Sequence, residues 1–141
     1  MEQSASPIQE PQTQGFYKVL SVLLLESSFK RDVGIDATII DEIENEISIT
    51  PAAHETTQDN KFAVTLSVQY KGMQTNEQIC LANIKMIGVF EKIGQPILPD
   101  ERFKAINGPA ILYQFIREHL HNLCLKAGIA NVLLPTVNFK P

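Results

Sequence analysis

An alternation of apolar and polar residues with a period of two constrains the fold of this chain more than any other feature. From Phe62 to Tyr70 every second residue is large and apolar or aromatic, and the residues between are Ala, Thr, Ser and Gln. Successive side chains of a β-strand point to opposite faces of a sheet, so this pattern predicts a strand with one buried face. A shorter alternation places Ile43, Ile47 and Ile49 on one face of a strand predicted over residues 42–50.

Two further segments complete the predicted sheet. Residues 16–29 contain no Gly or Pro and predict a long strand that is apolar on both faces from Val22 to Leu25. Residues 77–90 predict a fourth strand, with Gly88 as a bulge or a close backbone approach. We expect Pro51 to end the second strand, and residues 30–41 to form a crossover loop. Four strands joined by short connections imply an antiparallel sheet.

The last third of the chain predicts helices. Residues 100–107 suit a short helix, and Pro109 occupies the first turn of a longer one, where proline is tolerated. Apolar residues then recur at helical spacing until Gly128, a candidate for the left-handed residue after a helix. The expected fold class is α+β: a four-stranded antiparallel sheet with a short helix and a long C-terminal helix on one face. Residues 1–14 read as a disordered tail, and residues 15–141 as the folded domain.

Composition argues against several classes of protein. The 141 residues suit one domain, and a net charge of −4 with no basic run argues against a nucleic-acid partner. No apolar run approaches the roughly 20 residues of a membrane helix, and residues 1–14 lack the apolar core of a signal peptide, so we expect no membrane insertion and a cytoplasmic location. Cys80 and Cys124 have no partner at metal-ligand spacing and read as reduced, half-buried thiols.

The titratable residues do not form a recognisable catalytic set. His54 lies in a polar loop, and His119 and His121 are two positions apart, so they point to different faces of the predicted helix. Glu42, Glu44 and Glu46 alternate along a strand and are interpreted as its solvated side rather than as metal ligands. We therefore predict that the chain is not an enzyme and needs no metal or cofactor.

The predicted fold leaves a surplus of apolar surface. One layer of helices covers one face of a sheet, yet the first and fourth predicted strands carry apolar residues on both faces. One interpretation is plain self-association. The other adds a groove that holds apolar segments of other polypeptides.

Several sequence motifs resemble the bacterial protein-export chaperone family SecB. They are Gly-Val-Phe at 88–90 followed by Gly94, Gly-Pro-Ala-Ile-Leu-Tyr at 108–113, the pair Arg117-Glu118, and Leu-Pro-Thr-Val-Asn-Phe at 134–139. The pair Leu25-Glu26 resembles the opening strand of the family more weakly.

The resemblance implies a homotetramer built as a dimer of dimers, which holds non-native polypeptides in apolar grooves without ATP. Carried onto this sequence, Ile47 and Ile49 are the best groove candidates, with Leu25 and Phe29 weaker ones. Apolar burial is non-directional, so such a groove can hold many different sequences.

The family also docks on the translocation motor SecA through acidic positions of the exposed sheet and through a C-terminal helix. Glu26 matches one acidic position and Leu81 an apolar neighbour, whereas Val22 and Asn83 stand uncharged at other positions, and this chain stops at Pro141. We therefore favour the branch of SecB-like proteins that protects an antitoxin in a toxin–antitoxin system. General export of unfolded precursors to SecA is the alternative. A hotdog-like thioesterase is a remote one, because its long helix would stand early rather than last.

Overall fold

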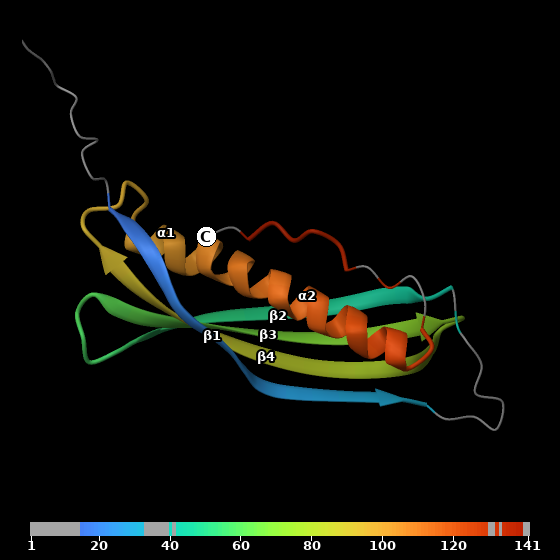
Figure 1. Cartoon of the computed structure of the whole chain (residues 1–141). Helices are drawn as coiled ribbons and strands as arrows, with labels where there is room; N and C mark the ends of the chain where they lie inside the picture. Colours follow the sequence, from blue (N-terminus) through green and yellow to red (C-terminus); the bar gives the residue numbers. More distant parts are fainter. Residues whose placement is uncertain (1–14, 33–39, 41, 130–131, 133, 140–141) are drawn as a thin grey trace, which may run out of the picture.

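The computed structural model describes residues 15–32, 40, 42–129, 132 and 134–139 (Figure 1). Its elements are β1 (Phe16–Arg31), β2 (Glu44–Glu55), β3 (Lys61–Gln74), β4 (Glu77–Ile93), α1 (Asp100–Arg102), the π-helical turn η1 (Phe103–Asn107) and α2 (Gly108–Lys126). The tail predicted at residues 1–14 and most of the predicted crossover loop lie outside the described residues.

The four strands form one antiparallel sheet in the order β1-β4-β3-β2. Figure 1 shows α2 lying across one face of this sheet, and we call that side the covered face and the other the open face. β3 and β4 are joined by a tight turn in which Thr75 and Asn76 have φ of 49° and 64°, the left-handed geometry of short hairpin turns. The α+β arrangement predicted from the sequence is confirmed.

The hydrophobic core lies between α2 and the two central strands. Leu112, Ile116, Leu120 and Cys124 follow one another at four-residue spacing along α2 and are fully buried. Gly88 is a close approach rather than a bulge, because a Cβ there would lie 2.9 Å from the Phe90 ring and 3.1 Å from Leu112. The missing side chain therefore lets α2 pack directly on β4.

An aromatic cluster attaches α1 and η1 to the sheet. The ring of Tyr17 stacks on Phe103 with centroids 4.1 Å apart, and Phe62 and Phe90 complete the cluster. The Tyr17 hydroxyl donates to the backbone oxygen of Leu98 and to Asp100 Oδ1, each at 2.7 Å. Burial and the Asp100 carboxylate raise the pKa of Tyr17 to about 12, and the same hydrogen bond lowers the pKa of Asp100.

The predicted end of the second strand is wrong. Pro51 does not end β2, which continues in register as far as Glu55 opposite Phe62. β2 is an edge strand, and an edge strand tolerates a residue that has no N–H to donate. The short helix predicted at residues 100–107 is present as α1 and η1, and it continues into α2 without a break. The wider turn of η1 suits Pro109, which cannot donate to the preceding turn.

The cysteines are more deeply placed than predicted. Cys80 and Cys124 are both free and fully buried rather than half-buried. Burial raises the pKa of the Cys124 thiol to about 12 and also raises that of Cys80. These two cysteines therefore serve as apolar core residues.

The described residues 134–139 run back along α2 (Figure 1). Gly128 has φ of 75°, which agrees with its predicted place after the helix. The Tyr113 hydroxyl then donates to the backbone oxygen of Pro135 at 2.7 Å, and the ring of Phe139 packs edge-on against Tyr113. Within the described part of the chain, no helix is both long and apolar enough to cross a membrane.

Candidate functional site

The described residues offer no set of converging catalytic groups. Each histidine makes a separate contact: His54 with Thr65, His119 with Ser27 and His121 with the backbone oxygen of Val132. In the ranges that the structure covers, no three His, Cys, Asp or Glu side chains stand close enough to hold a metal ion. The groups with a shifted pKa are buried tyrosines and cysteines of the core, together with Asp100 at its hydrogen bond to Tyr17.

Exposed apolar side chains instead gather on β1, at one edge of the sheet. Six large apolar side chains of this strand are between 39% and 54% exposed: Phe16, Val19, Leu20, Leu23, Leu24 and Leu25. Among the residues that the structure describes, β1 pairs only with β4, so its other side is an edge of the sheet. A long, apolar strand with an unpaired edge is an efficient template for pairing with another polypeptide.

The opposite edge carries a second apolar stripe. Ile47, Ile49, Pro51 and Ala53 occupy alternate positions of β2 and therefore share its covered face. The two isoleucines are half-buried against the core, whereas Pro51 and Ala53 are exposed. Pro51 and Ala53 were missed from the sequence, because the strand was expected to stop at Pro51. The same two-residue period that singled out Ile47 and Ile49 extends to both of them.

This stripe leads into a groove between β2 and the start of the helices. The groove has a volume of about 360 Å³, and small apolar residues line it, among them Pro51, Ala53 and Ala105. Lys104 closes one side with an ion pair to Glu55 at 2.7 Å, and the Lys104 ammonium also lies 5.1 Å from the centre of the Phe62 ring. An apolar floor with a polar rim suits an extended segment of polypeptide.

The outer side of α2 adds a third patch. Phe115 and Leu125 are about half exposed, and the polar pair Glu118 and Asn122 lies between them along the helix, joined by a 2.6 Å hydrogen bond. Positions 115, 118, 122 and 125 follow helical spacing, so they form a continuous stripe on the side of α2 that faces away from the sheet.

Comparison with known proteins identifies the family of the chain. A sequence model described as "Preprotein translocase subunit SecB" matches residues 23–141, which is most of the chain. The chain belongs to the SecB family. Two curated relatives carry the name protein-export protein SecB: that of Halorhodospira halophila is 31% identical over 87 residues, and that of Saccharophagus degradans is 28% identical over 82 residues.

The two alignments cover 62% and 57% of this chain and 50% and 49% of the relatives. The chain thus spans about half the length of the curated SecB proteins that it matches. A solved structure, the SecB-like chaperone Rv1957 of Mycobacterium tuberculosis in complex with a ChAD peptide from the Rv1956 HigA1 antitoxin, has the same fold. It superposes with a TM-score of 0.67 over 86% of this chain and 88% of that one, at 16% identity.

Within this SecB fold the four predicted groove residues divide between two edges. Ile47 and Ile49 lie on β2, whereas Leu25 and Phe29 lie on β1, with β3 and β4 between them. The four side chains therefore do not line one groove within a single subunit. Their assignment to client binding remains a prediction.

The predicted translocase contacts share the open face. Leu81 and Asn83 lie there because their neighbours along β4 are buried in the core, and Glu26 lies there because it pairs with Lys85 of the same alternation. Val22 does not share it: this residue packs against the core opposite Gly88. The register shift between Leu24 and Glu26 switches the face to which alternate residues of β1 point. Val22 and Glu26 are an even number of residues apart and nevertheless lie on opposite faces.

Proposed function

We propose that this protein is an ATP-independent chaperone that binds non-native polypeptides along the apolar β2 stripe and its groove and keeps them from aggregating, without catalysing a reaction. The observation that carries this proposal is the exposed apolar stripe of β2 with the groove beside it, on a fold of the SecB family. Covering exposed apolar surface contributes on the order of 25 cal/mol per Å², and this contribution does not require one particular partner sequence. We further propose that the protein acts in the cytoplasm.

The client is proposed to be the antitoxin of a toxin–antitoxin system. Support comes from the Rv1957 structure, in which a SecB-like chaperone of the same fold is seen with an antitoxin peptide. The groove beside β2 suits such a segment: its small side chains leave room for larger ones from the client.

The proposed assembly is a homotetramer, a dimer of dimers. Two surfaces support it independently of the client groove: the apolar edge of β1, and the stripe from Phe115 to Leu125 on α2. Each is a single continuous patch, and symmetric oligomers use the same patch on both copies. With those surfaces covered by other copies, the β2 stripe and its groove would remain for clients.

An aggregation assay tests the client-binding proposal. A chemically unfolded client is diluted into buffer without nucleotide, and light scattering is followed with and without the chaperone. We expect the chaperone to suppress scattering, and the double variant Ile47→Asp, Ile49→Asp to lose most of this protection, because charges would replace the apolar stripe. If the double variant protects as well as the wild type, the β2 stripe is not the client site.

A second pair of variants separates binding from folding. Ile47 and Ile49 also contact the core, so their loss can unfold the chain. Ala53→Asp changes an exposed residue of the same stripe, and Thr50→Asp places the same charge on an exposed residue of the open face. We expect Ala53→Asp to weaken protection and Thr50→Asp to leave it unchanged. Equal loss in both variants would contradict the assignment.

General protein export is the second candidate function. It is favoured by the names of the two curated relatives, both protein-export proteins. In that case SecA is the proposed partner, and Glu26 and Leu81 are the proposed contacts. Mass spectrometry of polypeptides that co-purify from the native host distinguishes the two: one dominant antitoxin supports the first proposal, and many unfolded secretory precursors support export.

A further inference from the structure

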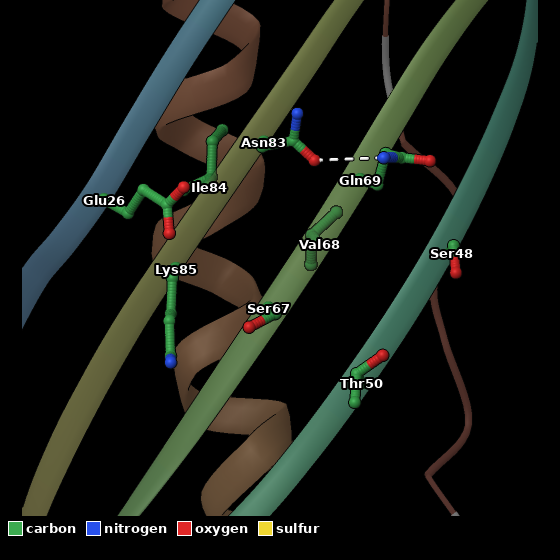
Figure 2. A pocket seen from close by; sticks show the side chains of 9 residues that line it. All are labelled: Glu26, Ser48, Thr50, Ser67, Val68, Gln69, Asn83, Ile84 and Lys85. Carbon is green, nitrogen blue, oxygen red and sulfur yellow. Dashed lines mark hydrogen bonds between the residues drawn. The ribbon is translucent and has the colours of Figure 1, made fainter.

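The open face of the sheet contains a polar hollow that client holding does not use. Figure 2 shows its lining, which comes from all four strands: Glu26, Ser48, Thr50, Ser67, Val68, Gln69, Asn83, Ile84 and Lys85. The hollow has a volume of about 360 Å³. Apart from Val68 and Ile84, which also belong to the core, every one of these residues has a polar side chain.

The centre of the hollow is rich in hydrogen-bond donors. Gln69 Nε2 donates to Asn83 Oδ1 at 3.1 Å across β3 and β4, as the dashed line in Figure 2 shows. This bond uses the acceptor of Asn83 and leaves both N–H groups of its amide, and one of Gln69, directed to solvent or to a ligand. Ser67 precedes Gln69 on the open face of β3, and its hydroxyl group adds another possible donor.

Lysines surround these donors. On the open face, Lys85 is the next residue after Asn83 on β4, and Lys71 is the next residue after Gln69 on β3, in the opposite direction. Lys30 of β1 lies opposite Leu81, beside Lys71. Among the described residues, none of the three makes an ion pair. Figure 2 shows the Lys85 side chain running away from the carboxylate of Glu26, its neighbour on β1.

The anionic residues of this part of the face stand at its margins. Glu26 lies on the edge strand β1 and Glu46 on the edge strand β2, whereas Lys71 and Lys85 lie on the two inner strands. Glu26 lines the hollow opposite Lys85, and Glu46 lies opposite Lys71, so the positive charge of this part of the face is confined to the two inner strands.

We propose that this hollow docks an acidic, extended segment of a partner polypeptide, with a carboxylate seated over the Asn83–Gln69 amide pair. Such a carboxylate would accept charge-assisted hydrogen bonds from the amide N–H groups and would lie between Lys71 and Lys85. The margins limit the length of the acidic stretch, because Glu26 and Glu46 would repel further carboxylates at either edge.

The charge distribution favours a polypeptide over a nucleic acid. Three lysines and two glutamates around a shallow hollow provide few phosphate contacts, and the affinity of proteins for nucleic acids depends on many such contacts. The hollow is separate from the β2 stripe, which lies on the covered face, so this docking adds a partner to the proposed client binding and does not depend on it.

Fluorescence anisotropy with the full chain tests the proposal. The probe is a fluorescein-labelled peptide of alternating Glu and Ser, compared with a Lys-Ser peptide of the same length and with a single-stranded oligonucleotide of the same charge. We expect the Glu-Ser peptide to bind most tightly. The double variant Lys71→Gln, Lys85→Gln should bind it about tenfold more weakly, because it loses two exposed charge pairs with the peptide. Tighter binding of the Lys-Ser peptide or of the oligonucleotide overturns the proposal.

A matched control removes the same amount of charge elsewhere. Lys18 lies at the far end of the open face opposite Glu91, and Lys126 lies at the end of α2. The double variant Lys18→Gln, Lys126→Gln has the same net charge as the test variant, and we expect it to bind the Glu-Ser peptide as the wild type does. Equal weakening in the two double variants would show a general effect of net charge and would overturn the assignment to the hollow.

Discussion

Replacing Leu23 and Leu24 by serine tests whether a second copy of the chain covers β1. The two side chains point to opposite faces of this edge strand and are 54% and 48% exposed, so each keeps about half of its surface available to a partner. Burying a whole leucine side chain contributes about 1.5–3 kcal/mol, so covering the exposed half contributes about 1 kcal/mol.

A two-fold contact contains both residues of both copies, which makes four such side chains. Their loss removes about 4 kcal/mol from association, which corresponds to a dissociation constant roughly a thousandfold higher. Sedimentation velocity over a dilution series measures this shift directly. The variant should remain folded, because only half of each side chain is buried within its own subunit.

Ile97→Ser is the matched control, since Ile97 is 78% exposed and lies in the loop before α1, which contacts the start of β1 at Tyr17 rather than Leu23 and Leu24. We expect it to assemble as the wild type does. The reasoning is refuted if the wild type stays a monomer at all concentrations, or if the double variant assembles as tightly as the wild type.

Two further predictions concern the folded subunit. Tyr17→Phe should lower the free energy of unfolding in urea by about 1 kcal/mol at neutral pH. Because the hydrogen bond lowers the folded-state pKa of Asp100, this contribution is present above the ordinary value of 3.8 and lost as pH falls, so a difference that persists unchanged in acid would contradict the assignment. Burial raises the pKa of Cys124 from 9.0 to about 12, so stability should fall as pH rises from 9.0, with a slope approaching 1.4 kcal/mol per pH unit from this thiol. Cys124→Ala should show a shallower fall across this range, and an identical pH profile would argue against the raised pKa.

The sequence by itself determined the kinds of element and most of their places. The alternation from Phe62 to Tyr70 and the helical spacing from Leu112 to Cys124 are local patterns, because the side-chain direction in each element repeats along its own backbone. The motifs near the C-terminus likewise led to the family, since they depend on residue identity and order.

Only the tertiary structure decided which residues share a surface. Strand order is set by pairing between distant segments, and the order β1-β4-β3-β2 places Leu25 and Phe29 at the edge opposite Ile47 and Ile49. A register shift after Leu24 reverses the facing of β1, so the two-residue period cannot be extended across it. The position of β2 at an edge also allowed the strand to continue through Pro51, because a missing N–H matters only where a neighbouring strand would accept it.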